Sequence, residues 1–158
     1  MKRDGLLVLL RHGIAEDAGR KADEERRLTA EGNAKMQEIA AALARIVPDA
    51  EAIYSSPLVR ARETAAWVAG AYGGRLAVTT TNVLAPGAGA AAFRHFLGGL
   101  DAASAYFVGH EPTLSEFTLD LAELRGDLAL KKGGCYGLRW NGRRAALEWM
   151  LTPRLLRG

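Results

Sequence analysis

The feature that most constrains the fold is an uninterrupted apolar run, Leu6–Leu10, that ends directly at Arg11-His12-Gly13. Consecutive apolar residues over a strand length, without polar alternation, are typical of a strand that is covered on both faces. The run 105–108 repeats the pattern and ends at Gly109-His110-Glu111-Pro112. A shorter run, 52–54, ends at Ser55-Ser56-Pro57. Buried strands of this kind belong to a sheet with helices on both sides, so the sequence predicts an α/β fold.

Helical segments are expected between these strands. Thr29 can cap a helix whose apolar residues recur at helical spacing and which Pro48 ends. Ser56 is expected to cap a second helix with Pro57 in its first turn, closed by Gly70 and by Gly73-Gly74. Two further helices are predicted around the apolar positions 93–100 and 114–121.

The remaining strands complete the predicted sheet. Residues 76–79 form a weak strand, and 138–140 and 147–151 flank Asn141-Gly142 as an antiparallel hairpin. Alternating strands and helices predict a three-layer fold with a mostly parallel central sheet, helices on both faces and an antiparallel C-terminal edge hairpin. We expect residues 1–158 to form a single domain.

Composition narrows the function classes. The net charge is +3, but the arginines are interspersed with acids and form no long basic block, so we expect no nucleic-acid partner. No apolar stretch approaches the roughly 18 residues that span a bilayer, so no membrane association is expected. The N-terminal apolar run is too short for a secretory signal, and Cys135 has no second cysteine to pair with. A cytoplasmic location is the expectation.

Three polar clusters follow the predicted strands, and the ends of parallel strands line the ligand crevice of an open α/β sheet. If the strands are neighbours, Arg11, His12, Arg60 and His110 converge there. Arginine matches phosphate oxygens with a fixed fork of donors, and neutral imidazole can attack phosphorus. His110 can bond a phosphoryl oxygen or move a proton, and the Gly13 carbonyl can fix the tautomer of His12. The combination points to a site for a dianion.

Simpler interpretations exist for each cluster taken alone. Arg60 and Arg62 can be solvated helix residues, and Ser56 can be an ordinary cap. His12 and His110 could ligate a metal, but the other histidine, His95, lies in a helix pattern, and Arg11 would repel a cation. We therefore expect neither a metal nor another cofactor.

Together the clusters resemble the histidine phosphatase superfamily, which has the phosphoglycerate mutase-like fold, and within it the short SixA-type phosphohistidine phosphatases. The resemblance covers nearly the whole chain. Its motifs are Leu9-Leu10-Arg11-His12-Gly13-Ile14-Ala15, Arg27-Leu28-Thr29-Ala30-Glu31-Gly32, Ser55-Ser56-Pro57-Leu58-Val59-Arg60-Ala61-Arg62-Glu63-Thr64-Ala65, Val108-Gly109-His110-Glu111-Pro112-Thr113-Leu114 and Glu148-Trp149-Met150-Leu151-Thr152-Pro153.

The resemblance implies that His12 is the phosphorylated nucleophile and that Arg11, Arg60 and His110 complete the catalytic phosphate pocket. The expected substrate-binding residues are Gly13, Arg26, Ser56 and Glu111. Short members often have Arg-Pro-Leu-Thr where this chain has Arg26-Arg27-Leu28-Thr29, which leaves open which arginine faces the pocket.

A second departure concerns the general acid that mutases and many larger phosphatases carry between the second and third motifs. Between Arg75 and Ala92 this sequence has no Asp or Glu. Either another acid serves, or the substrate hardly requires one. The alternative acids are Glu16, Asp23, Glu24 and Glu111.

The preferred interpretation is a metal-independent phosphatase for protein phosphohistidine or related phosphomonoesters, acting through a covalent intermediate on His12. One alternative is a broad small-molecule phosphatase of the same fold; a mutase is disfavoured by the short chain and the missing acid. Another is a phosphoprotein-binding module without turnover. Expected partners are a phosphorylated protein, with histidine-containing phosphotransfer proteins as candidates, or a small phosphorylated substrate.

Overall fold

The computed structural model describes residues 1–19 and 22–158 and contains a six-stranded sheet in the order β3-β2-β4-β1-β5-β6. Strands β3, β2, β4 and β1 are parallel, whereas β5 and β6 run antiparallel at one edge. The strands are β1 (Gly5–Arg11), β2 (Ala52–Ser55), β3 (Val78–Thr80), β4 (Ser104–Gly109), β5 (Cys135–Trp140) and β6 (Ala145–Leu151). The predicted fold class, including the C-terminal edge hairpin, is confirmed.

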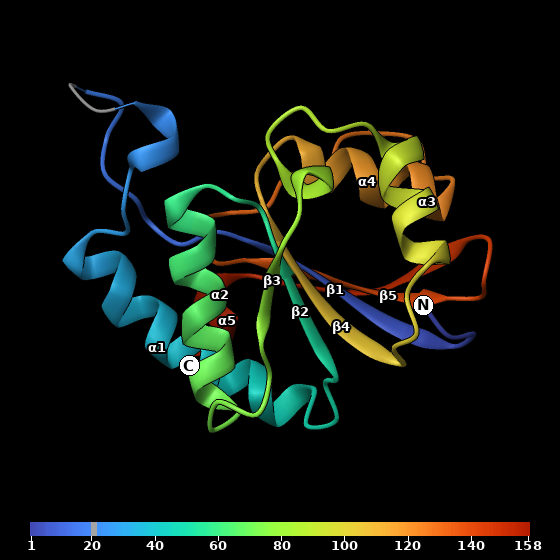
Figure 1. Ribbon diagram of the computed structural model, residues 1–158, viewed down its shortest axis with the longest axis horizontal. Helices are drawn as coiled ribbons and strands as arrows, with labels where there is room; N and C mark the ends of the chain where they lie inside the picture. Colours follow the sequence, from blue (N-terminus) through green and yellow to red (C-terminus); the bar gives the residue numbers. More distant parts are fainter. Residues whose placement is uncertain (20–21) are drawn as a thin grey trace.

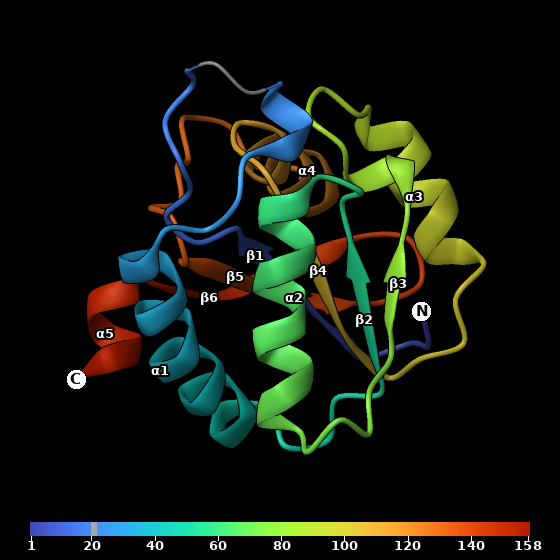
Figure 2. The ribbon, with the colours of Figure 1, turned by 60° about the vertical axis from the view of Figure 1, so that its left-hand side comes forward.

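Helices cover both faces of this sheet (Figures 1 and 2). They are α1 (Ala30–Ile46), α2 (Val59–Ala71), α3 (Ala90–Gly98), α4 (Thr113–Ala122) and α5 (Pro153–Arg157), with short 3₁₀ helices η1 (Asp23–Glu25) and η2 (Asn82–Leu84). One apolar cluster lies between the sheet and α1, α2 and α5, and a second lies between the sheet and α3 and α4. In the described part of the chain, no helix has the length and apolar character needed to cross a membrane.

The start of α1 is held against the segment that follows β1. Thr29 caps the helix as predicted, because its hydroxyl accepts the N–H of Gly32 at 3.0 Å. The Thr29 N–H in turn donates to the carbonyl of Ile14 at 3.0 Å. Gly32 packs on the same carbonyl so closely that a Cβ there would lie 2.0 Å from the Ile14 oxygen. This contact places α1 beside the residues that follow His12.

The structure corrects the predicted start of the second helix. Helix α2 begins at Val59, and its N-cap is Leu58 rather than Ser56. The backbone N–H of Ser56 donates to Val108 at 2.9 Å, so Ser56 extends the sheet pairing, and its hydroxyl contacts His110 at 2.8 Å. Pro57 is exposed and precedes the helix.

Smaller differences occur at other boundaries. The weak strand lies at Val78–Thr80 instead of 76–79, and Leu100 lies beyond the end of α3. Helix α5 was not predicted from the sequence. It is a single short turn, capped by the Thr152 hydroxyl, which accepts the N–H of Leu155.

Gly32→Ala should destabilise the protein by about 1–3 kcal/mol, because the added methyl group collides with backbone that cannot move without displacing the start of α1. The matched control is Gly70→Ala in α2, where a Cβ meets nothing within 4 Å. That change should be neutral or stabilise by up to about 1 kcal/mol through helix propensity. Urea unfolding of both variants checks this, and equal effects would contradict the packing argument.

Candidate active site

The two histidines of the predicted site lie side by side because β1 and β4 are parallel neighbours in register. Arg11 pairs with Gly109, and the residue that follows each of these strand ends is a histidine. The backbone N–H of His12 donates to the Gly109 carbonyl at 3.0 Å, and the two imidazole centroids are 5.1 Å apart. His12 is 6% exposed and His110 is 3% exposed.

The ring of His12 is held in one tautomer. Its Nδ1 lies 2.7 Å from the Gly13 carbonyl oxygen, which can only accept, so Nδ1 carries the hydrogen. This is the contact by which the Gly13 carbonyl was expected to fix the tautomer, whereas the role of Gly13 in binding substrate stays a prediction. Nε2 is then unprotonated and accepts from Nε of Arg60 at 3.3 Å. Burial, reinforced by the nearby His110 and arginines, lowers the pKa of His12 to about 3. The ring is therefore neutral, with its lone pair directed toward Arg60.

Close packing around position 13 gives a second reason why this residue is a glycine. Its N–H donates to the Thr64 hydroxyl at 3.0 Å, and that hydroxyl donates to the Arg60 carbonyl at 2.7 Å. A Cβ at Gly13 would lie 2.7 Å from the side chain of Met36. The absence of a side chain at position 13 therefore lets the backbone after His12 pack between α1 and α2.

Arg60, in the first turn of α2, is 5% exposed and binds Asp23. Its Nη1 donates to the Asp23 carbonyl at 2.6 Å, and its Nη2 donates to Asp23 Oδ2 at 2.9 Å. Arg62, two residues further along α2, is exposed. The hydrogen bond from Arg60, followed by that from Arg26, holds the pKa of Asp23 below its usual range. Asp23 is thus an ionised partner of the pocket arginines.

Arg26 and Arg27 point to different neighbours, which answers the question left open by the sequence. Arg26 Nη1 donates to Asp23 Oδ1 at 2.7 Å, so this arginine joins the cluster formed by Asp23 and Arg60. Arg27 instead donates to Glu63 at 2.7 Å, and its side chain is 68% exposed. Arg26 is the one positioned beside the pocket.

His110 is also neutral. Burial, followed by the charge of Arg60, lowers its pKa to about 4. Its Nε2 lies 2.8 Å from the Ser56 hydroxyl. Ser56 thus orients His110, and no contact in the structure bears on its predicted role in binding substrate. Among the described residues, the buried Nδ1 of His110 has no hydrogen-bond partner.

Arg11 and Glu111 both form hydrogen bonds with the backbone of Leu130. Arg11 Nη1 donates to the Leu130 carbonyl, while its buried Nε has no partner within the described residues. Arg11 lies close enough to lower the pKa of both His12 and His110. Burial raises the pKa of Glu111, although bonds from Ser115 and the Leu130 backbone oppose that shift. The buried donor on Arg11, next to two neutral imidazoles, suits an incoming anion.

The four alternative acids occupy different environments. Asp23 is ionised against arginines, and Glu16 Oε2 accepts the backbone N–H of Arg27 at 3.0 Å. Glu24 is exposed in η1. Glu111 has a raised pKa, but its recorded contacts are with Ser115 and Leu130. Within residues 1–19 and 22–158, no group of three or more His, Cys, Asp or Glu side chains is arranged to hold a metal ion.

The chain is similar to known proteins both in sequence and in fold. The sequence pattern of the histidine phosphatase superfamily (branch 1) matches residues 7–85, which carry His12 and Arg60. The chain belongs to the histidine phosphatase superfamily. An uncharacterized protein from Picosynechococcus sp. is 36% identical over 139 residues, which cover 84% of each chain.

Solved histidine phosphatase structures share the fold. The protein histidine phosphatase SixA in complex with tungstate superimposes with a TM-score of 0.87 at 19% identity, covering 96% of this chain and 99% of SixA. A mycobacterial glucosyl-3-phosphoglycerate phosphatase in complex with VO3 gives a TM-score of 0.72 at 19% identity, covering 94% of this chain and 99% of that one. The fold therefore occurs with both protein and small-molecule phosphatases.

The two buried histidines should make the free energy of unfolding depend on pH. Because their pKa values are lowered to about 3 and about 4, they take up protons near pH 6.5 only when the chain unfolds. Their contribution is fully present above about pH 6.5 and is lost as the pH falls toward the folded-state values. We expect the free energy of unfolding to fall by about 1.4 kcal/mol per pH unit for each neutral histidine between pH 6 and 4.5.

Urea unfolding at several pH values measures this slope. His12→Ala should make it shallower, whereas His95→Ala, which removes an exposed histidine, should leave it unchanged. An unaltered slope in His12→Ala would contradict the lowered pKa of His12.

Proposed function

We propose that the protein hydrolyses phosphohistidine in proteins through a covalent phosphohistidine intermediate on His12. The observation that carries the proposal is the state of His12: Nδ1 is held by the Gly13 carbonyl at 2.7 Å, and Nε2 lies 3.3 Å from Arg60 Nε. A neutral imidazole whose unprotonated Nε2 faces a buried arginine is arranged to attack a phosphorus atom whose oxygens that arginine binds.

The surrounding groups supply the charge stabilisation that phosphoryl transfer requires. Arg60 and Arg11 provide donors for equatorial oxygens, and these donors are already placed before the reaction begins. His110 contributes a further donor if its unpartnered Nδ1 carries the hydrogen. The similar SixA and mycobacterial phosphatase structures hold tungstate and VO3, oxyanions that resemble phosphate, and this supports a phosphate site on this fold. In this proposal the arginines neutralise charge without a metal ion.

Asp23 must release Arg60 for the phosphoryl group to bind both Nη donors. Its carboxylate and carbonyl occupy those donors at 2.9 Å and 2.6 Å. The exchange of one anion for another keeps the buried guanidinium paired throughout, which avoids the large cost of an isolated buried charge. Asp23 lies in the short 3₁₀ helix η1, above the start of α2 (Figure 2).

The leaving group decides between N–P and alkyl O–P substrates. An alkyl phosphate expels an alkoxide unless an acid protonates it. Asp23 is held ionised by arginines, and the Glu111 carboxyl, whose pKa is raised, is hydrogen-bonded by Ser115. Phosphohistidine leaves as neutral imidazole once its ring is protonated, and the ordinary pKa of about 6.5 makes that protonation easy. The site therefore favours a phosphorylated protein, with histidine-containing phosphotransfer proteins as candidate partners.

His12→Ala should abolish turnover because it removes the attacking atom. Wild-type protein mixed with substrate and quenched without acid should carry phosphate on His12 in mass spectrometry. The matched control is His95→Ala, an exposed histidine outside the pocket, which should keep wild-type activity. Phosphate on Ser56 or Cys135, or phosphate release by His12→Ala, would overturn the mechanism.

Substrate preference tests the leaving-group argument. In the presence of EDTA, kcat/KM for a phosphohistidine protein or p-nitrophenyl phosphate should exceed that for 3-phosphoglycerate by about tenfold or more, since each 1.4 kcal/mol in barrier is a factor of ten. The assay is repeated with Glu16→Gln, Asp23→Asn, Glu24→Gln and Glu111→Gln. If the protein hydrolyses the alkyl phosphate at an equal rate and one of these variants loses that activity, the substituted residue is the general acid. This result would favour the small-molecule phosphatase.

Loss of all activity in EDTA would contradict the metal-free mechanism. Substrate binding without phosphate release would indicate a binding module.

A further inference from the structure

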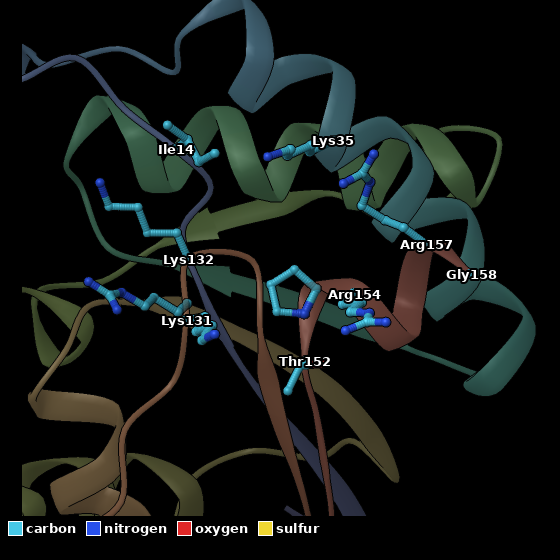
Figure 3. Close-up of a pocket in the computed structure, with 10 residues that line it drawn as sticks. Ile14, Lys35, Lys131, Lys132, Thr152, Arg154, Arg157 and Gly158 are labelled. Carbon is cyan, nitrogen blue, oxygen red and sulfur yellow. The ribbon is translucent and has the colours of Figure 1, made fainter.

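A basic pocket of about 760 Å³ lies beside the candidate active site. Its cationic lining residues come from distant parts of the sequence: Lys35 of α1, Lys131 and Lys132 of the loop before β5, and Arg154 and Arg157 of α5 (Figure 3). Arg11, at the end of β1, completes the set. We call this hollow the basic pocket.

Much of this charge is not neutralised within the protein. Lys35 pairs with Glu31, and Arg157 pairs with Glu38 at 2.8 Å. For Lys131, Lys132 and Arg154, the described part of the chain provides no ion pair, and no described acid lines the pocket. A concave surface lined by one sign of charge concentrates the field and attracts the opposite sign.

The basic pocket adjoins the catalytic centre through Arg11. This arginine lines the pocket, and its charge also lowers the pKa of His12 and His110. Ile14, two residues beyond the nucleophile, lines the pocket as well. A ligand held there would lie next to a phosphoryl group bound at His12, yet Lys131, Lys132 and the cations of α5 have no part in the proposed chemistry.

We propose that the basic pocket binds an acidic segment of the phosphoprotein substrate, and so selects phosphohistidine in an acidic surrounding. The inference rests on the proposed function, because it assigns a substrate class to that site. Besides its cations, the lining includes the apolar side chains of Ile14 and Pro153. Such a surface matches a peptide that carries both carboxylates and apolar side chains.

Other anions fit this lining less well. The described lining residues include no aromatic side chain on which a nucleobase could stack. A compact polyphosphate is best held by converging arginine forks, whereas half of the six cations here are lysines, one on α1 and two on the loop before β5.

The test uses two synthetic phosphohistidine peptides that differ only at four flanking positions, which are Glu in one and Lys in the other. The wild-type protein should hydrolyse the Glu peptide with a kcat/KM at least tenfold higher, mainly through a lower KM. Lys131→Glu combined with Lys132→Glu should remove this preference while leaving hydrolysis of p-nitrophenyl phosphate within about twofold. Added NaCl should reduce the preference, because exposed charges are screened.

The matched control is Lys2→Glu combined with Arg3→Glu. Lys2 and Arg3 are also exposed. They precede β1, whereas Arg11 lies at the other end of this strand, so the variant makes the same change in net charge far from the pocket. The control should retain the preference for the Glu peptide. A loss equal to that of the pocket variant would show that overall charge, not the pocket, is responsible.

Binding is measured separately from turnover by fluorescence anisotropy of a labelled, unphosphorylated peptide of alternating Glu and Leu. Wild-type protein should bind it at least tenfold more tightly than the pocket variant. If no substrate is hydrolysed but this binding difference holds, the proposed function fails and the pocket assignment stands. Equal hydrolysis of both peptides, or a pocket that binds tripolyphosphate or oligo-dT but not the acidic peptide, overturns the inference.

Discussion

The parallel pairing of β1 with β4 is the constraint on which the site depends. The register sets Arg11 opposite Gly109, and the chain leaves both strands at the same edge of the sheet. His12 and His110 therefore emerge together, with ring centroids 5.1 Å apart, although 98 positions separate them in the sequence. A shift of one residue in this register would direct one imidazole to the opposite face of the sheet.

Charge burial accounts for most of the remaining geometry. Two imidazoles are buried beside Arg11 and Arg60, and their neutral state follows from burial and from these cations. Arg60 itself is 5% exposed, so its guanidinium requires a partner, which Asp23 supplies. The Asp23 carboxylate thus lies where the proposed phosphoryl group would bind. Arg26 supports that anion, and this explains why it rather than Arg27 adjoins the pocket.

The sequence predicted helices and strands correctly where a residue type has one dominant structural role. Thr29 caps α1, Pro48 follows its end, and the uninterrupted apolar runs are buried strands. Ser56 was assigned wrongly as a cap because its backbone N–H pairs with Val108 and its hydroxyl with His110. Serine before proline favours a helix start only when no stronger partner is near, and that partner lies on a strand more than fifty residues away.

The order of residue types along the chain was enough to place Arg11, His12 and His110 at strand ends and Arg60 soon after one, because parallel strands covered by helices must expose their carboxyl ends at one edge. The pairing of Arg60 with Asp23, the choice of Arg26 over Arg27 and the basic pocket required the folded chain. Nothing in the sequence indicates that Lys35, Lys132 and Arg157 line one pocket. They meet only because α1 and α5 pack on the same face of the sheet, and long-range electrostatics depends on distances that packing alone establishes.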